Sequence, residues 1–315
     1  MINKRNEAWL DKERRKEMAQ RHLNYVYNNY YDDTCKSING TEIHEVFKIN
    51  DNEWSENHLL NSTIIPIKQE DTIINVTNGT TVDAINRYYR RYGLYNNEES
   101  KTAALNFASY KNPGGKFLEG SIAQEEFLCH SSNLYNILMK FDESYYKINR
   151  QNTNNHLYHS NLLYTPSVIF IDKNVITARC DIITCAAPNT HAAMKYANVS
   201  YEECLKSMIE RVDHVLNAAY KHHVKNLILG AFGCGVFGNN ATDVASVFMS
   251  LLNTKYNNVF KMVEFAIPIS AYNNNNEEFY NVLRIFEAFK KCNIDQAIKK
   301  FPLTDKLIGE RPWRK

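Results

Sequence analysis

The stretch of sequence at residues 106–126 reads NFASYKNPGGKFLEGSIAQEE. The apolar residues 103–108 predict a buried strand, and the Pro-Gly-Gly after them predicts a turn. A short loop then leads to Gln124, Glu125 and Glu126 at the start of an apolar helix. Glycines at a strand end let backbone amides approach an anionic ligand, and adjacent carboxylates can supply an acid or a base. The pattern indicates chemistry on a phosphorylated or nucleotide-like substrate.

The length and composition of the chain limit the classes of protein to which it can belong. A chain of 315 residues holds one large domain or two small ones, and a hydrophobic content of 44% predicts a sizeable core. A net charge of +2 argues against a general nucleic-acid or membrane surface, and no apolar run is long enough to span a bilayer. Residues 1–21 are charged throughout and do not resemble a signal peptide. We therefore expect an intracellular protein, cytoplasmic or nuclear.

The cysteines give no sign of a disulfide framework or a metal site. There are seven of them, an odd number, widely spaced and without a Cys-x-x-Cys pair. This usage is typical of reduced intracellular thiols packed as small hydrophobic side chains.

Strand-like and helix-like segments alternate along the chain. The alternation predicts an α/β sheet with helices on both faces. The Asn-rich stretches 149–155 and 272–276 are predicted to be surface loops. Strands are predicted at 42–49, 72–76, 103–108, 168–171, 181–186, 226–229 and 263–267, and helices at 3–31, 80–92, 123–141, 201–222, 243–252 and 277–290.

A second glycine-rich stretch, LGAFGCGVFGN, occupies residues 229–239. Gly233, Gly235 and Gly238 form Gly-x-Gly-x-x-Gly between a predicted strand and a predicted helix, the spacing of a Rossmann pyrophosphate turn. The turn lies late in the chain, and no acidic residue follows about twenty residues on to bind a ribose. A diphosphate-binding loop outside a Rossmann fold is the preferred interpretation, and a glycine turn needed only for packing is the alternative.

The string at 106–126 resembles the microbial-type poly(ADP-ribose) glycohydrolases, a branch of the macrodomain fold. Their hallmark is a glycine triplet followed a few residues later by Gln-Glu-Glu. Here Gly114-Gly115-Lys116 precedes an intact Gln124-Glu125-Glu126, with Lys116 in place of the third glycine. The second glycine loop resembles the family's loop that clasps a diphosphate. Less specific matches in the right order lie at residues 15–19, 76–84 and 183–189.

The resemblance implies a fold, an activity and a substrate. The fold is a three-layer α/β/α macrodomain-like fold with a mixed central sheet and an N-terminal helical extension. Residues 1–60 would form an accessory helix and strand packed on a catalytic core of residues 61–315. The activity is hydrolysis of the ribose–ribose O-glycosidic bond, without a metal or an organic cofactor. The partner is poly(ADP-ribose) or an ADP-ribosylated protein, with no direct DNA binding and no membrane.

The same resemblance assigns roles to individual residues. Glu126 is the proton donor that then activates water, and Glu125 orients the ribose. A neighbouring negative charge and partial burial raise the pKa of a Glu carboxyl, which suits an acid near neutral pH. The alternative is a pair of solvated glutamates favoured by the helix dipole. The predicted substrate-binding residues are Asn106, Gly114, Gly115, Lys116, Gln124, Gly233, Cys234, Gly235, Val236, Phe237 and Gly238.

Three of these residues have a second interpretation. Asn106 either bonds the ribose or caps a turn. Phe237 either packs against the adenine or its ribose or belongs to the core. Cys234 has no visible activating partner, so we interpret it as a small loop residue and not as a nucleophile.

The glycohydrolase is the first hypothesis for function. A non-catalytic ADP-ribose reader and a hydrolase of single ADP-ribose units on proteins are the alternatives. Lys116 supports the reader, because a non-glycine residue costs about 1–2 kcal/mol where the backbone is left-handed. The intact Gln-Glu-Glu argues against a decayed site, so we predict an ordinary backbone at Lys116 and an active enzyme.

Overall fold

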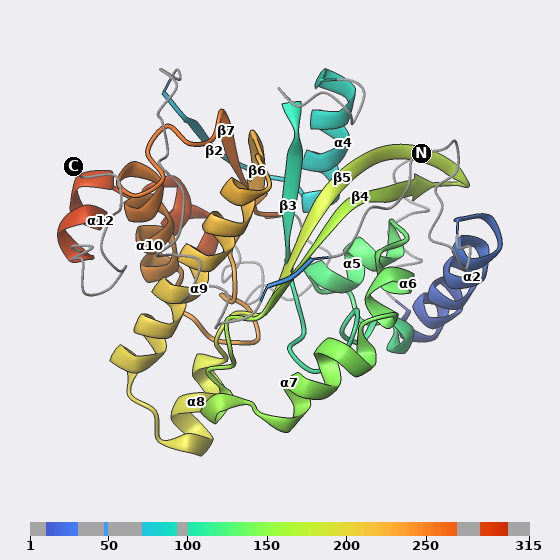
Figure 1. The fold of residues 1–315 in the computed structure, drawn as a ribbon, viewed down its shortest axis with the longest axis horizontal. Helices are drawn as coiled ribbons and strands as arrows, with labels where there is room; N and C mark the ends of the chain where they lie inside the picture. The colour runs from blue at the N-terminus through green and yellow to red at the C-terminus, as the bar shows by residue number, and fades with distance from the viewer. Residues whose placement is uncertain (1–10, 31–46, 50–70, 93–99, 270–283, 302–315) are drawn as a thin grey trace.

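A mixed seven-stranded sheet forms the centre of the molecule (Figure 1). The computed structural model describes residues 11–30, 47–49, 71–92, 100–269 and 284–301. The strand order is β1-β4-β5-β3-β6-β7-β2, in which β1, β4 and β5 pair antiparallel and the other neighbours pair parallel. The strands are β1 (Phe47–Ile49), β2 (Ile73–Thr77), β3 (Thr102–Phe107), β4 (Leu162–Asp172), β5 (Val175–Cys185), β6 (Asn226–Leu229) and β7 (Met262–Ala266).

Helices cover both faces of the sheet, which confirms the three-layer prediction. Side chains alternate along β3, so that Ala103 and Leu105 pack into one hydrophobic cluster and Ala104 packs into another. The first cluster includes residues of α9, α10 and α12, and the second includes residues of α4, α5 and α6. These helices are α4 (Thr81–Tyr92), α5 (Gln124–His130), α6 (Leu134–Met139), α9 (Tyr201–Lys221), α10 (Ala241–Asn253) and α12 (Ile294–Lys300).

Local capping explains why several predicted helices begin where they do. The Ser200 side chain accepts from the Glu203 backbone, and Glu203 returns the bond, which forms a capping box at the start of α9. The Asn240 side chain accepts from the amides of Thr242 and Asp243 at the start of α10. The predicted helices at 80–92, 201–222 and 243–252 are confirmed to within two residues at either end.

The predicted helix over 123–141 is wrong, because the chain leaves the helix between α5 and α6. Ser132 forms a β-bridge with Phe170 of β4. On either side of it, Ser131 accepts a hydrogen bond from the amide of Ile171, and the Asn133 amide donates to Ile169. Backbone pairing with the sheet therefore replaces one turn of helix, which apolar periodicity alone does not reveal.

Strands β4 and β5 are one long antiparallel hairpin, of which the sequence predicted only parts. The turn places Lys173 and Asn174 at φ of 50° and 64°, the geometry of a two-residue type I′ turn. The pairing shifts register between Thr165 and Val168, and Ser167 there has a φ of 54°. Pro166 and this bulge interrupt the alternation of side chains, so the two halves of β4 did not look continuous.

The Asn-rich composition near residue 150 did not correctly predict which residues lie on the surface. Asn149 lies in α7 (Lys147–Gln151) and is buried, with its side-chain amide donating to the carbonyl of Tyr110 at 3.1 Å. The prediction of a surface loop over 149–155 is therefore wrong at Asn149. The other predicted loop, at 272–276, lies outside the described residues.

The N-terminal helix α2 (Lys12–Tyr30) lies at the flank of the sheet, beside α5 and α6 (Figure 1). Its residues Ala19 and Val26 are fully buried. The predicted boundary at residue 60 and the helical residues predicted before Asp11 lie outside the described residues. Strand β1 pairs with β4 in the same sheet, and residues 284–290 confirm the end of the last predicted helix.

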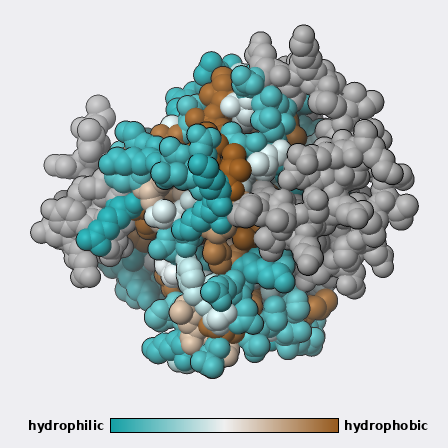
Figure 2. All heavy atoms as spheres, turned by 90° about the vertical axis from the view of Figure 1, so that its left-hand side faces the viewer, coloured by the Kyte–Doolittle hydropathy of each residue, from teal (hydrophilic) through white to brown (hydrophobic). Residues whose placement is uncertain are grey.

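One face of the described surface is mostly polar (Figure 2). On the side of α12, hydrophilic residues predominate and hydrophobic residues show as narrow patches between them (Figure 2). Within the described residues no helix is both long and apolar enough to cross a membrane. The six cysteines that the structure describes are not joined by disulfides.

Candidate active site

The end of β3 places a buried amide beside a carboxylate. Asn106 is 0% exposed and pairs across β3 and β5 with Thr184. Its Nδ2 donates to Thr184 Oγ1 at 3.3 Å and to Glu125 Oε1 at 3.2 Å. Its Oδ1 is buried and has no hydrogen-bond partner among the described residues. A buried oxygen without a partner costs free energy, which marks Asn106 as a candidate for ligand binding.

The Pro-Gly-Gly turn folds directly over the two glutamates. Gly114 and Gly115 have φ of 65° and 60°, a conformation that favours glycine. A Cβ on Gly115 would lie 2.5 Å from Glu126 Oε1 and 3.0 Å from Glu125 Oε2. The close approach that the sequence predicted for an anionic ligand is made here to the protein's own carboxylates.

Glu125 is held on both of its oxygens. Its Oε2 accepts from the Ser109 amide at 2.7 Å, and its Oε1 accepts from Asn106. The side chain is nearly fully buried, and desolvation raises its pKa to about 8, with a smaller contribution from the charge of Glu126. Glu125 therefore keeps its proton near neutral pH.

Glu126 has one oxygen held and one unbonded. Its Oε1 accepts from the backbone amide of Lys116 at 2.9 Å. Its Oε2 is buried and has no hydrogen-bond partner among the described residues. The two glutamates have different partners, as expected for neighbours at a helix start, and burial rules out a pair of solvated first-turn glutamates.

Lys116 adopts an ordinary backbone conformation, as predicted. Its φ is −110° and its ψ is 35°, so the position does not require glycine. The ammonium group lies on the surface, 3.7 Å from Glu119 Oε2. Lysine is therefore compatible with the turn, and its backbone amide still reaches Glu126.

Gln124 fixes α5 against the sheet. Its Oε1 accepts from the Phe107 amide at 2.8 Å, and its Nε2 donates to the Leu105 carbonyl at 2.8 Å and to Thr81 Oγ1 at 3.0 Å. Both ends of the side-chain amide are thus used within the protein. The structure gives Gln124 a positioning role, and the predicted contact with substrate stays a prediction.

The second glycine loop follows β6, which is the neighbour of β3 in the sheet. Gly233 and Gly238 have φ of 72° and 69°, whereas Gly235 has open space around it. Asn239 closes the loop, because its Nδ2 donates to the carbonyls of Gly233 and Pro188. Val236 at the tip is 89% exposed. The sequence analysis assigned Asn239 no role, since a side-chain bond across a loop leaves no spacing signal.

Stacked aromatic rings connect the two glycine loops. Phe237 packs edge-on against Tyr158 with ring centroids 5.9 Å apart, and Tyr158 stacks on Tyr110 at 4.2 Å. Tyr110 precedes the Pro-Gly-Gly turn, so this row of rings spans from one loop to the other. Phe237 is thus at least partly a packing residue, one of the two interpretations that the sequence left open. Tyr110 and Tyr158 were not predicted, because no spacing relates them.

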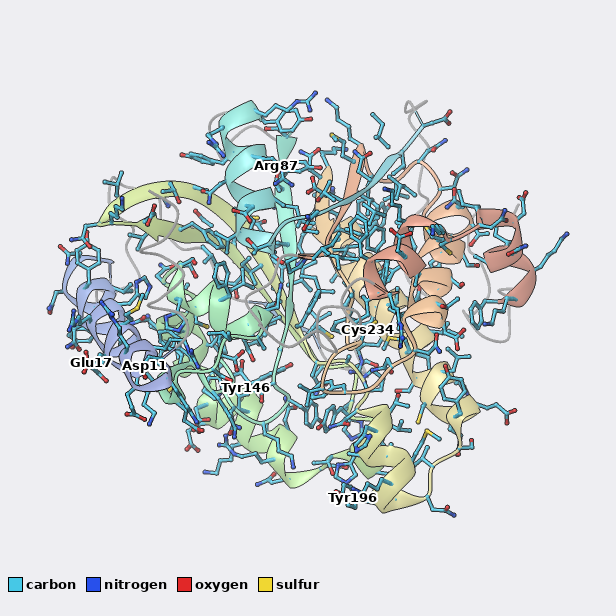
Figure 3. The ribbon with its side chains drawn as sticks, turned by 180° about the vertical axis from the view of Figure 1, so that it is seen from behind. Asp11, Glu17, Arg87, Tyr146, Tyr196 and Cys234 are labelled. Atoms are coloured by element: carbon cyan, nitrogen blue, oxygen red, sulfur yellow. The ribbon has the colours of Figure 1, made fainter. Side chains whose placement is uncertain are left out.

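Cys234 lies in the second loop and is labelled in Figure 3. Burial raises the pKa of its thiol to about 12. The thiolate is therefore scarce near neutral pH, in agreement with a small loop residue and not a nucleophile.

Two further buried groups to which the sequence analysis gave no role interact with the glutamates: Cys129 and Tyr146, of which Tyr146 is labelled in Figure 3. Desolvation raises the pKa of both well above the ordinary values, and the charge of Glu125 raises each further. Both groups are therefore neutral at physiological pH. The spacing of four residues between Glu125 and Cys129 on one helix is the signal that links them. Within the described residues, no three His, Cys, Asp or Glu side chains are grouped as metal ligands.

Comparison with known proteins identifies the family. The model of the microbial-type PARG catalytic domain matches residues 20–173. The structure of the poly(ADP-ribose) glycohydrolase (PARG) from Deinococcus radiodurans in complex with ADP-ribose has 31% sequence identity and a TM-score of 0.64, and covers 79% of this chain and 95% of its own. The chain belongs to the microbial-type poly(ADP-ribose) glycohydrolases.

Other members of this family are also similar. The enzyme from Thermomonospora curvata has 27% identity and a TM-score of 0.72 over 89% of this chain and 100% of its own. The same enzyme bound to the inhibitor ADP-HPD has 26% identity and a TM-score of 0.68, over 89% and 99%. A comparison with curated protein sequences gives no match.

The raised pKa of Glu125 predicts a specific dependence of stability on pH. Folded Glu125 keeps its proton up to about pH 8, whereas the unfolded carboxyl loses it near its ordinary value of 4.5. Its contribution to stability is therefore complete below the unfolded pKa and is lost as the pH rises through the folded pKa, at up to about 1.4 kcal/mol per pH unit. Glu125→Gln abolishes this titration, and rotation of the Asn106 amide lets its Oδ1 accept from the new NH₂ group.

Urea unfolding of both proteins from about pH 5 to about pH 8.5 measures the effect. The wild-type free energy of unfolding should fall relative to Glu125→Gln across this range. Glu143→Gln, on the exposed surface, is the control, and its free energy of unfolding should change with pH in parallel with that of the wild type. A constant difference between wild type and Glu125→Gln would contradict the assigned burial.

Proposed function

We propose that this protein hydrolyses the ribose–ribose O-glycosidic bond of poly(ADP-ribose) and releases ADP-ribose. The observation that carries the proposal is the state of Glu126. One of its oxygens is fixed by the Lys116 amide, and the other is buried with no hydrogen-bond partner in the part of the chain that the structure describes. A carboxyl group with one oxygen oriented and one available is suited to proton transfer at a glycosidic bond.

In the mechanism that we infer, the two carboxylates divide the chemistry. Cleavage passes through an oxocarbenium-like state, which needs a proton for the leaving oxygen and a base for water. Oε2 of Glu126 donates the proton to the leaving ribose oxygen and then takes one from the attacking water. Glu125 is itself protonated near neutral pH, because burial raises its pKa, so it adds no charge beside Glu126.

The surrounding groups would bind the substrate. Glu125 and the unbonded Oδ1 of Asn106 accept hydrogen bonds from ribose hydroxyls. The backbone of the second loop, from Gly233 to Gly238, binds the diphosphate, with Gly235 and Val236 at its open tip. The exposed edge of Phe237 packs on the adenosine. The ADP-ribose complex of the related Deinococcus enzyme supports ADP-ribose as the ligand.

The reader hypothesis rested on Lys116, and the structure removes its physical basis. The backbone at Lys116 is not left-handed, so lysine causes no strain there. The carboxylates are present and oriented, which a non-catalytic reader does not need. Incubation of the purified protein with poly(ADP-ribose), followed by mass spectrometry of the products, tests the proposal. Free ADP-ribose is the expected product, and tight binding without release would favour the reader.

Glu126→Gln should abolish turnover and leave ADP-ribose binding largely intact. Loss of a positioned general acid costs about 10²–10⁴-fold in rate. A chain-release assay measures turnover, and calorimetry measures binding. Glu119→Gln, an exposed glutamate of the same loop, is the control and should retain activity. Near wild-type turnover in Glu126→Gln would remove Glu126 from the assigned role.

Gly235→Val should weaken ADP-ribose binding while the protein stays folded. A Cβ at Gly235 meets no atom within 4 Å, so the fold tolerates it, but a branched side chain blocks close approach of a diphosphate to the backbone. Calorimetry should show a loss of at least about tenfold in affinity, equivalent to about 1.4 kcal/mol. Gly79→Ala, in another turn with room for a Cβ, is the control. Unchanged affinity with a normal melting curve would exclude this loop as the phosphate site.

Lys116→Gly should change turnover only modestly. The glycine still presents its backbone amide to Glu126, and the lost ammonium group lies on the surface. We expect kcat within about threefold of wild type, since a surface charge contributes little. A large gain in turnover on Lys116→Gly would mean that lysine impairs the turn, contrary to the geometry.

A further inference from the structure

Helix α2 lies beside the turn that holds Glu126. In Figure 3 its position at the flank of the molecule is marked by Asp11 and Glu17. The side that it turns toward the protein carries Arg15, Ala19, His22 and Val26, a helical stripe. Ala19 is fully buried in the same cluster as Phe117 and Leu128. The packing therefore joins α2 to both the turn and α5.

Two hydrogen bonds attach α2 to backbone carbonyls around the site. Arg15 Nε donates to the Gly120 carbonyl at 2.6 Å. His22 Nε2 lies 2.8 Å from the Ser132 carbonyl oxygen, after the end of α5. Gly120 itself has a φ of 75°, and a Cβ there would lie 2.6 Å from the carbonyl oxygen of Lys12. The backbone of α2 and that of the turn are thus in direct contact.

Short-range hydrogen bonds link Gly120 rigidly to Lys116. The 3-10 turn η2 (Phe117–Glu119) lies between them. The Gly120 amide donates to Phe117, and the amides of Glu119 and Ser121 both donate to the carbonyl of Lys116. The Lys116 amide then donates to Glu126 Oε1. A displacement of Gly120 is therefore passed to the Lys116 amide, which orients the Glu126 carboxylate.

We infer that Arg15 is a positioning residue for hydrolysis, acting through Gly120 and η2 on the Lys116 amide that orients Glu126. The inference rests on the proposed function and assigns part of it to a helix outside the sheet. The Arg15 guanidinium fixes the turn at the Gly120 carbonyl, a group that binds no substrate in the mechanism above. A hydrogen bond to a backbone carbonyl from a charged donor is among the stronger ones, which suits this bracing role.

Arg15→Ala should lower kcat and leave substrate binding nearly unchanged. A small displacement of the Lys116 amide misplaces Glu126, and misplacement of a catalytic group costs roughly ten- to hundredfold in rate. KM for poly(ADP-ribose) and the Kd for ADP-ribose should stay within about twofold, because the proposed diphosphate site lies in the second glycine loop and not in the turn that Arg15 contacts. Arg15→Lys should recover much of the turnover, since an ammonium group can still donate to Gly120.

Two further variants make the test specific. Arg14→Ala removes the same charge from an exposed neighbour on the helix and should match the wild type. Gly120→Ala forces α2 away from the turn, so it should reproduce the loss of kcat, and the double variant with Arg15→Ala should lose little more.

Wild-type kcat in Arg15→Ala would overturn the inference and leave the proposed function standing. The inference would also be overturned if Arg15→Ala lowered kcat, raised KM and lowered the melting temperature together, and if Arg15→Lys restored none of them. An inactive wild type would overturn the proposed function itself.

Discussion

The site depends on one close approach, that of the Pro-Gly-Gly backbone to the carboxylate of Glu126. The distance is so short that a Cβ at Gly115 would clash with the carboxylate oxygen. Positive φ at both glycines aims the next amide, that of Lys116, at the same oxygen. The turn therefore requires glycine at two positions for a steric reason and tolerates lysine at the third. A glycine pattern alone cannot distinguish these cases, because they differ only in φ.

Burial of two adjacent glutamates has an electrostatic consequence for the whole site. An isolated buried carboxylate is costly, so the protein supplies backbone amides from Ser109 and Lys116 and an amide side chain from Asn106. Two buried neutral groups, the thiol of Cys129 and the ring of Tyr146, add no charge. The remaining cost appears as the raised pKa of Glu125, which is protonated near neutral pH and adds no charge beside Glu126, the proposed acid.

The sheet brings the two glycine loops together. Strand β3 lies between β5 and β6, and all three are parallel, so their carboxyl ends meet at one edge. The turn over the glutamates follows β3, and the second glycine loop follows β6. The rings of Phe107 and Phe232, 5.7 Å apart, pack the starts of the two loops against each other. On the other side of β3, strand β5 of the antiparallel hairpin buries β3 and brings Thr184 to Asn106 at this edge.

The sequence by itself determined the α/β class and most of the element positions, and it predicted the residues of the site. Apolar periodicity and local caps act over a few residues, and the Gln124–Glu126 and glycine spacings carry chemistry that is local in the chain. The tertiary structure alone decided what each residue contacts. The break after α5 came from pairing with β4, and the burial of Asn149 came from the carbonyl of Tyr110. Three further features join segments that are far apart in the sequence. They are the hydrogen bonds of Gln124 to β3 and Thr81, the row of rings from Tyr110 to Phe237, and the contact of Arg15 with Gly120. Such contacts depend on how separate elements pack, and no spacing within one chain segment encodes them.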